Sequence, residues 1–535
     1  MKIRIIGFYF HFPQSLPVSL ESARWMWKDS IHEVQALHNS IKSDSNFVAD
    51  DLHVWTNCKS IECLDGSLVI ENVLADEIDS AVKLQIADGS DKSDIHSVLR
   101  GILWNGDLDP DDLDQRMTTV LSFSGFCPLL DRPTSLDLLQ RHRRYLASFT
   151  YGENLPAGLT PDFVSREFFE LDKKPDGDLH SFVFKNFHEL DAEIAFYQPD
   201  LRIFRLELNG LTARSAEILK SLKARVKDSV SLHWLSDTIQ SEPSVLRPWP
   251  SYIEMELSSA SPVQDRLLPE AGNQQLPKPE RETILQSIAS MPPQEITVCL
   301  GGLGDSGADE ESVSVALSLL EMDSVKEVFV ETYGYDLLRW IQEADRHGQA
   351  PWNKLSFIVR LCSLRSDRYD YFYSGGNLNQ VLQQLEQVQS WLKNLEADRS
   401  NKAPSFFVEM QKIREVEDEI HDFFQKFDPT PITPILRKQN TYCGQLENRS
   451  IADLTPLIRG FCWHLARDLY INAEGKVPLC RQDPHASRIS ASVQGDTLLS
   501  IFQAGDREYL HSMRGQHDQI QAPCLQCDEW YLFQG

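Results

Sequence analysis

The sequence predicts an α/β protein built in three parts. Short apolar runs alternate with amphipathic helical stretches through most of the chain, whereas residues 441–535 are rich in turns and cysteine. Three prolines within residues 241–251 indicate a linker. We therefore expect an α/β region over 1–240, a linker over 241–251, a second α/β region over 252–440 and a small cysteine-bearing region over 441–535.

Composition narrows the classes of function. The chain has 535 residues, with 52 Lys+Arg against 79 Asp+Glu, and so a formal net charge of −27. A surface this acidic disfavours nucleic acid and anionic membranes as partners, and no apolar run approaches the ~20 residues of a membrane helix. His11 and Pro13 interrupt the only signal-like run, at the N-terminus. We expect a cytoplasmic protein whose ten cysteines are free thiols or metal ligands, with a protein or small-molecule partner that the sequence does not specify.

The first region shows strand patterns at 3–10 and 118–123 and a helical pattern at 135–149. Residues 121–163 resemble part of the sugar-nucleotide nucleotidyltransferases, which implies a nucleotidyltransferase-like domain. Those enzymes carry a metal-binding Asp at the end of a central strand, where this chain has Ser124–Pro128. They also carry a glycine loop after the first strand, which cradles phosphates with its backbone amides and is absent here. Nucleotidyl transfer is therefore not expected.

The second region contains six apolar strand patterns, most of them separated by helical ones. Such alternation predicts parallel strands joined by right-handed crossovers, in an open partial barrel or a doubly wound sheet. Pro434 cannot donate to a strand ladder, so the last strand should lie at an edge. The six patterns are YIEMEL (252–257), EITVCL (295–300), KEVFVET (326–332), SFIVRL (356–361), SFFVEM (405–410) and ITPIL (432–436).

The strongest chemical signal is a set of four cysteines near the C-terminus, Cys462, Cys480, Cys524 and Cys527. Residues 468–480 predict a β-hairpin turning at Glu474–Gly475, and the closing C-x-x-C would bring two further thiols to one point. Four converging thiolates suit an iron–sulfur cluster or tetrahedral zinc. Four buried cysteines that bind nothing remain the alternative, and Cys443 is the one spare thiol nearby in sequence.

This pattern resembles the SPASM domain of radical S-adenosylmethionine (radical SAM) enzymes. The match consists of Cys462-x12-Gly475-x4-Cys480, then Asp483, Gly495–Asp496 before a helix, and the closing Cys524-x-x-Cys527. In that family the domain holds auxiliary 4Fe–4S clusters. Further cysteines normally follow the C-x-x-C, but residues 528–535 contain none. The resemblance therefore implies one 4Fe–4S cluster, with Cys462, Cys480, Cys524 and Cys527 as its ligands.

The resemblance to radical SAM enzymes continues upstream, since that family has a partial (βα)6 barrel. Gly301–Asp305 is similar to the turn that contacts the methionine end of its cofactor, and Glu331–Gly334 stands where the third strand ends. The family places C-x3-C-x2-C after the first strand, whereas residues 258–272 contain no cysteine. Ser and Ala do not ligate a cluster, so a degenerate barrel that has lost cofactor cleavage is expected.

The order of the three parts is similar to that of the spiro-SPASM family: a nucleotidyltransferase-like region, a radical-SAM-like barrel and a SPASM-like end. It implies a protein that keeps one auxiliary 4Fe–4S site and has a non-catalytic binding or scaffold role. Two alternatives stay open, a structural zinc protein and an enzyme (a transferase or oxidoreductase) that uses the barrel mouth with another cofactor. The glycines at 302, 304 and 307 match a dinucleotide fingerprint, but the carboxylates at 309–311 would repel a pyrophosphate.

Overall fold

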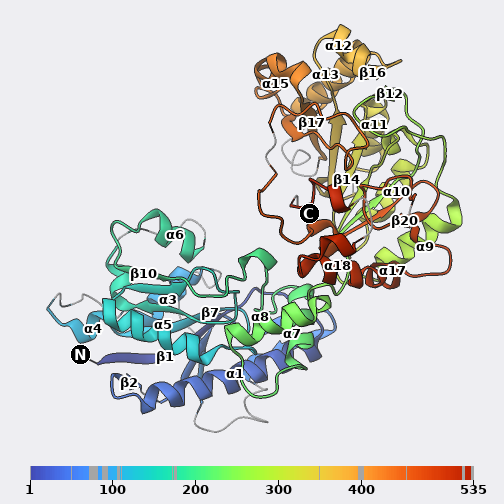
Figure 1. Cartoon of the computed structure of the whole chain (residues 1–535). Coiled ribbons are helices and arrows are strands. Elements are labelled where there is room, and N and C mark those ends of the chain that lie inside the picture. The colour runs from blue at the N-terminus through green and yellow to red at the C-terminus, as the bar shows by residue number, and fades with distance from the viewer. Residues whose placement is uncertain are drawn as a thin grey trace. The chain divides into compact units, whose positions relative to one another are not determined.

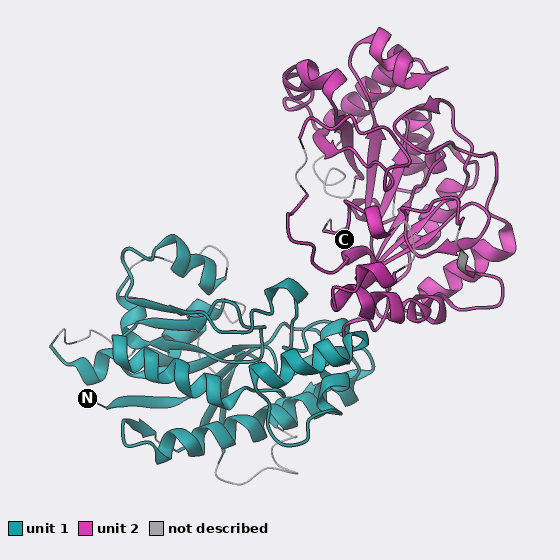
Figure 2. Cartoon of the chain, viewed as in Figure 1, with its two compact units in different colours: residues 1–245 teal, residues 246–535 magenta. Residues whose placement is uncertain are grey.

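The chain forms two compact units, Met1–Val245 and Leu246–Gly535 (Figure 2). The border between them falls inside the proline-bearing segment 241–251. Among the described residues, no helix has the length and apolar character needed to cross a bilayer. The computed structural model describes residues 2–49, 51–71, 82–86, 94–104, 109, 111–171, 173, 178–348, 350–395, 403–452, 455–487, 489–520 and 524–531.

Unit 1 is built on a mixed sheet whose described strands run in the order β10-β8-β9-β7-β1-β3-β6, with β2 also paired to β1. β1 is parallel to β7 and β3, so their carboxyl ends lie at one edge of the sheet. β9 runs antiparallel between β7 and β8. The strands are β1 (Ile3–His11), β2 (Phe47–Ala49), β3 (His53–Thr56), β6 (Lys83–Ile86), β7 (Thr119–Ser124), β8 (Phe149–Gly152), β9 (Asp162–Ser165) and β10 (Ala192–Ala195), beside a hairpin of β4 (Ser60–Cys63) and β5 (Gly66–Val69).

The helices of unit 1 begin at polar caps. Ser19 and Asp131 each accept a hydrogen bond from a backbone N–H of the first turn of α1 and α5, which fixes where these helices start. The long α1 crosses the lower part of the unit in Figure 1. The helices are α1 (Leu20–Ser43), α3 (Ile95–Leu103), α4 (Leu113–Arg116), α5 (Arg132–Tyr145), α6 (Leu179–Lys185), α7 (Ala213–Lys223) and α8 (Leu232–Ser241).

Unit 2 contains all six predicted strands, and each pairs in parallel with the next along the chain. The sheet order is β18-β17-β15-β14-β13-β11-β19. β18, which carries Pro434, lies at the edge, as predicted. The strands are β11 (Tyr252–Met255), β13 (Ile296–Leu300), β14 (Val325–Thr332), β15 (Leu355–Arg360), β17 (Ser405–Lys412), β18 (Thr433–Lys438) and β19 (Asp468–Ile471), with a two-residue pair of β12 (Gln264–Asp265) and β16 (Tyr373–Ser374).

Helices connect the six strands in turn (Figure 1). A doubly wound sheet reverses its strand order at a switch point, whereas here every crossover moves one strand along in the same direction. Of the two predicted architectures, this winding matches the partial (βα)6 barrel. The helices are α9 (Lys278–Ala289), α10 (Ser312–Leu320), α11 (Leu337–Arg346), α12 (Ser366–Phe372), α13 (Leu378–Asn394) and α15 (Ile420–Phe427).

The C-terminal region shares the sheet of unit 2. β19 extends the sheet by pairing in parallel with β11, while β20 pairs antiparallel with β21. The predicted hairpin over 468–480 is therefore wrong as a strand pair, because each arm has a different partner, although the turn itself is present at Gly475, where φ is +72°. The elements are α16 (Trp463–Arg467), β19, β20 (Lys476–Pro478), β21 (Ile489–Ser492), α17 (Leu498–Ala504) and α18 (Asp506–Met513).

Candidate functional site

The four predicted cysteines influence one another electrostatically in the structure. Burial raises the pKa of Cys480 well above its ordinary value, and Cys524, Cys527 and Cys462 raise it further. Burial likewise raises the pKa of Cys462, with contributions from Cys527 and Cys524. These effects require the four side chains to lie near one another, although they come from segments spread over more than sixty residues of sequence.

The four cysteines come from three segments of unit 2. Cys462 caps the start of α16, and its backbone N–H donates to the hydroxyl of Ser512 at 2.9 Å. Cys480 follows β20, and Cys524 begins a short 3₁₀ turn that leads to Cys527. Cys462, Cys480 and Cys524 are buried, whereas Cys527 is half-buried. The group is therefore largely shielded from solvent.

A fifth thiol belongs to the same neighbourhood. Cys443 is buried, and Cys527, burial, Cys480 and Cys524 all raise its pKa above the ordinary value. Its thiol donates to the Oε1 atom of Gln482 at 3.9 Å. The sequence analysis identified Cys443 only as a spare thiol. Its position shortly after β18, at the end of the barrel, was the one signal that could have linked it to the other cysteines.

The donor chemistry of this group fits a thiolate-bound metal centre, but its geometry is not a closed cage. In the part of the chain that the structure describes, no three His, Cys, Asp or Glu side chains are arranged to hold a metal ion. The neighbouring thiol of Cys443 is the largest cause that lowers the pKa of Cys527 to about 7, against the effect of burial. Soft, buried sulfur donors of this kind suit iron–sulfur clusters and zinc.

His464 lies beside the cysteines, within hydrogen-bonding distance of two groups. Its Nδ1 atom is 2.5 Å from the carboxylate of Asp468, and its Nε2 atom is 3.1 Å from the carbonyl oxygen of Glu529. Both ring nitrogens are thereby occupied. His464 joins the start of β19 to the segment after Cys527, which is a supporting role.

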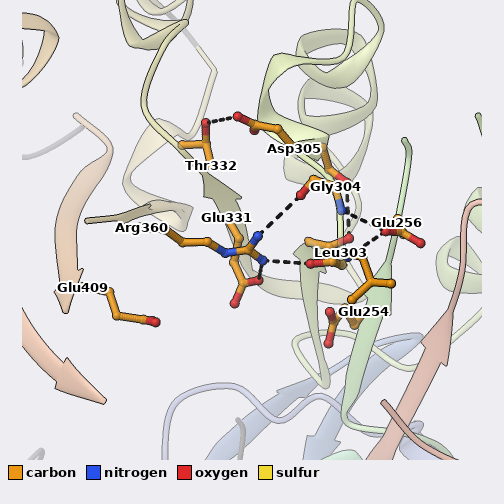
Figure 3. A network of polar contacts seen from close by, with 12 residues as sticks. Glu254, Glu256, Leu303, Gly304, Asp305, Glu331, Thr332, Arg360 and Glu409 are labelled. Atoms are coloured by element: carbon orange, nitrogen blue, oxygen red, sulfur yellow. Dashed lines mark hydrogen bonds and ion pairs between the residues drawn. The ribbon is translucent and has the colours of Figure 1, made fainter. Parts of the chain in front are cut away.

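The glycine loop after β13, Gly301–Asp305, is hydrogen-bonded to two side chains of the protein itself. The carboxylate of Glu256 accepts hydrogen bonds from the backbone N–H groups of Leu303 at 2.7 Å and Gly304 at 3.1 Å (Figure 3). The guanidinium of Arg360 donates to the carbonyl oxygens of Gly302 at 2.9 Å and Gly304 at 3.4 Å. The loop that resembles a cofactor-contacting turn is thus bonded on both its donor and its acceptor sides.

Arg360 also belongs to a buried charge network centred on Glu331, at the end of β14. The Oε2 atom of Glu331 is 2.5 Å from Arg360 and 3.2 Å from Arg481, and its Oε1 atom is 3.4 Å from Arg437. Burial alone would raise the pKa of Glu331, but the three arginines hold it well below its ordinary value. Glu331 is 1% exposed, so these charges are almost entirely withdrawn from water.

Two further carboxylates complete the network. Glu409 pairs with Arg437 at 2.9 Å, and Glu254 pairs with Arg481 at 3.2 Å. Burial raises the pKa of Glu254 to about 7, and its Oε1 atom has no hydrogen-bond partner. The sequence analysis missed this network, although a signal existed: the strands β11, β14, β15, β17 and β18 each place one of its charged residues directly after apolar ones, namely Glu254, Glu331, Arg360, Glu409 and Arg437.

The sequence analysis found no C-x3-C-x2-C motif after the first barrel strand, which is β11 in the structure. Residues 258–272, which follow β11, contain Ser258 and Ser259 but no cysteine. The two cysteines of the barrel strands have different surroundings. Cys299 interacts with Glu331 and Glu254. Burial and, after it, the charge of Asp265 raise the pKa of Cys362 well above its ordinary value.

In unit 1, aromatic rings fill the carboxyl ends of the parallel strands. Phe12 follows β1 and Phe126 follows β7, and their ring centroids lie 4.9 Å apart. Trp27 of α1 packs edge-on against Phe12 at 5.7 Å, and Phe10 stacks on Phe123 at 5.0 Å. These rings occupy the edge at which open α/β sheets bind their ligands.

Comparisons with known proteins give one relative in sequence and several in structure. No family model matches the chain. An uncharacterized protein of Treponema pallidum (strain Nichols) is 26% identical over 368 residues, which cover 66% of this chain and 98% of the relative.

Among solved structures, BtrN in complex with AdoMet and 2-DOIA is 12% identical, with a TM-score of 0.34, over 53% of this chain and 97% of that one. Native anSMEcpe with bound AdoMet is 10% identical, with a TM-score of 0.35, over 49% and 82%. Streptococcus suis SuiB bound to S-adenosylmethionine is 11% identical, with a TM-score of 0.35, over 60% and 84%. These neighbours are radical SAM/SPASM-type enzymes. The α/β fold itself rests on the strand order described above.

Proposed function

We propose that this chain is a radical SAM/SPASM-related protein that holds one auxiliary 4Fe–4S cluster and acts as a binding or scaffold protein without cleaving S-adenosylmethionine. The ligands proposed are Cys462, Cys480, Cys524 and Cys527. The single observation that supports the proposal is that burial and the other three cysteines, which come from other segments, all raise the pKa of Cys480. Such a cluster, when bound, would supply one-electron redox chemistry or cross-link the segments that carry its ligands.

The barrel end supports the loss of cofactor cleavage. An incoming methionine moiety would need backbone donors and acceptors of the loop after β13, and Glu256 and Arg360 already use them. A dinucleotide is disfavoured for the same reason, because the carboxylate of Glu256 stands where a pyrophosphate would bind. We therefore do not propose NAD(P) binding at this loop.

Metal analysis of the anaerobically purified full chain tests the proposal. We expect about four iron and four sulfide per chain and a brown protein. Zinc at one equivalent in a colourless protein would favour the structural zinc alternative, and the absence of both metals would contradict the proposal. Ser replacements of Cys462, Cys480, Cys524 and Cys527 should each lower the metal content, while Cys362→Ser, which changes a buried cysteine elsewhere in unit 2, should not.

A second assay addresses cleavage. Reduced, iron-reconstituted protein is incubated with S-adenosylmethionine, and 5′-deoxyadenosine is measured. We expect none. Production of 5′-deoxyadenosine would show that the barrel is active and would overturn the non-catalytic role, whatever the C-terminal cysteines bind.

A further inference from the structure

Unit 1 contains a cavity of about 230 Å³ next to the strands β8 and β10. These two strands are parallel neighbours, and the cavity is lined by residues 154–157, which follow β8, and by residues 201, 202 and 205–207, which follow β10. It therefore lies past the carboxyl ends of the strands, where open α/β sheets bind their ligands. The rings of Phe12 and Phe126 follow β1 and β7, on the far side of β9, so the cavity is a separate feature of this edge.

Hydrogen bonds fasten the two lining segments to each other near both of their ends. The buried side-chain amide of Asn154 donates to the carbonyl oxygen of Tyr197 at 2.6 Å and accepts from its backbone N–H at 2.9 Å. The backbone N–H of Leu208 donates to the carbonyl oxygen of Ala157 at 2.8 Å. At Gly158, where φ is +86°, a Cβ atom would lie 2.3 Å from the carbonyl oxygen of Leu208, so this close approach requires glycine. The cavity is therefore set in a pre-formed frame, as is usual for small-molecule sites.

Most of the residues that line the cavity are apolar, and Leu155, Leu201 and Leu206 are the largest of them. Leu201 and Leu206 are buried, which fixes this side of the cavity. Leu155 folds back toward the sheet because β8 ends in glycine: a Cβ atom at Gly152 would lie 2.3 Å from the Cδ1 atom of Leu155. The three leucines offer an apolar surface against which a ligand can withdraw apolar atoms from water.

The charged side chains that line the cavity are Arg202, Arg205 and Glu207. Asp200 accepts from the Nε atom of Arg202 at 3.1 Å and from its Nη2 atom at 2.6 Å, so this guanidinium is held in place and its charge is balanced. Arg205 and Glu207 are both exposed and have opposite charges. Because a guanidinium pairs well with a carboxylate, and a carboxylate with an ammonium group, these two residues match a ligand with one charge of each sign.

We propose that this cavity binds a small apolar α-amino acid in its zwitterionic form. The apolar side chain of the ligand lies against the three leucines, its carboxylate pairs with Arg205, and its ammonium group pairs with Glu207. A cavity of about 150 Å³ accommodates benzene, so the larger cavity of unit 1 has room for an apolar amino acid. The inference concerns unit 1 alone and goes beyond the proposed function, which concerns the cysteines of unit 2.

Isothermal titration calorimetry of the full chain with L-leucine and L-phenylalanine tests the proposal. We expect at least one of them to bind with a Kd in the millimolar range or tighter. For the tighter ligand, the analogue without the ammonium group (4-methylpentanoate or 3-phenylpropanoate) and the analogue without the carboxylate (3-methylbutylamine or 2-phenylethylamine) should each bind about tenfold more weakly, because each leaves one charged residue unpaired. Failure of both amino acids to bind would overturn the inference, and so would analogues that bind as tightly as the amino acid.

Three variants locate the binding in this cavity. Arg205→Gln should weaken binding of the amino acid about tenfold but not that of the amine, and Glu207→Gln should weaken binding of the amino acid but not that of the carboxylate analogue. Ala157→Leu, at an exposed position of the lining, should fill the space and abolish binding. Lys185→Gln changes an exposed charge at the end of α6, outside the lining, and should bind like the parent. Parental affinity in Arg205→Gln or in Ala157→Leu would overturn the inference.

Discussion

The two units fill the carboxyl ends of their parallel strands in opposite ways. In unit 1, Phe12, Phe126 and Trp27 pack against one another and leave an apolar edge. In unit 2, Glu331 and Arg360 are the centre of a buried network of charges around a glycine loop. Both ends are filled with side chains, and the second holds charged groups, Glu331 and Arg360 among them.

The difference matters because the stability of apolar packing and that of buried ion pairs depend on side-chain geometry to different degrees. The burial of apolar surface is non-directional, so an apolar group tolerates small changes in shape. A buried charge requires each partner in place, since an unpaired ion in the interior costs several kcal/mol. The comparison can be tested by changing one of these side chains in each unit and measuring the change in the free energy of unfolding.

The largest difference is expected between cysteines of the two units. Cys480→Ser should remove a metal ligand from unit 2, and metal ligation supplies on the order of 10 kcal/mol in structural zinc sites. Cys58→Ser in unit 1 should cost about 1 kcal/mol. Limited proteolysis should cut Cys480→Ser in the connection between β18 and α16, while Cys58→Ser digests like the parent. Equal resistance of the two variants would show that the thiol group does not stabilise this region.

Removal of one buried charge should be the next largest effect. Glu331→Gln keeps the size of the side chain but leaves Arg360, Arg437 and Arg481 with one fewer counter-charge. We expect a loss of about 3–5 kcal/mol in the free energy of unfolding of unit 2, measured by calorimetry. Asp200→Asn, which breaks an exposed ion pair with Arg202, is the control and should cost at most about 1 kcal/mol. A similar cost for both variants would mean that the network is not stabilising.

A change in the aromatic packing of unit 1 should lower the free energy of unfolding by less than Glu331→Gln does. Phe12→Leu alters the shape of a fully buried side chain while leaving it apolar. We expect about 1 kcal/mol, because neighbouring rings can repack. The same calorimetric transition of unit 1 is measured for Leu68→Val, a buried apolar change away from the aromatic group. If Phe12→Leu cost as much as Glu331→Gln, the proposed contrast between the two fillings would be wrong.

The smallest effect concerns pH. Because the pKa of Glu254 is raised to about 7, the folded state binds this proton more tightly than the unfolded state does. Its contribution to stability is therefore fully present below the ordinary value of about 4.5 and is lost as the pH rises through 7. Glu254→Gln should flatten the fall in unfolding free energy of unit 2 between these values. Denaturant titrations at pH 5, 6 and 7.5 measure the difference in slope from the parent, and identical slopes would contradict the assignment.

The sequence predicted the six strands of unit 2 well because each is a short apolar run bounded by polar residues. Their order followed from the alternation with helices, and the edge position of β18 followed from Pro434. The partner of β19 could not be predicted, because the pattern of residues 468–471 reports burial but not which strand lies beside it. The sequence analysis paired residues 468–471 with the segment that follows them, whereas in the structure they pair with β11, which is distant in sequence.

The candidate sites were predicted unevenly for a similar reason. Spacing alone identified Cys462, Cys480, Cys524 and Cys527 as a group, whereas Cys443 joins them through a turn whose conformation the sequence does not reveal. Glu331 and Arg360 stand inside apolar strands, so each alone looks like an exception to the pattern. Only the sheet order shows that such exceptions lie on neighbouring strands and neutralise one another.

The pairing of β19 with β11 also has a consequence for the order of folding. Glu256 accepts a hydrogen bond from the backbone of Ala473, 217 positions later in the chain. During synthesis, the other six strands of this seven-stranded sheet emerge first, and β11 presents an unpaired edge until β19 leaves the ribosome. An open edge of this kind invites pairing with other chains, and long-range parallel pairing is slow. A chain truncated before residue 468 should therefore aggregate even though the other six strands of the sheet are complete. In the full chain, β19 pairs with the open edge of β11 and so protects it from pairing with other chains.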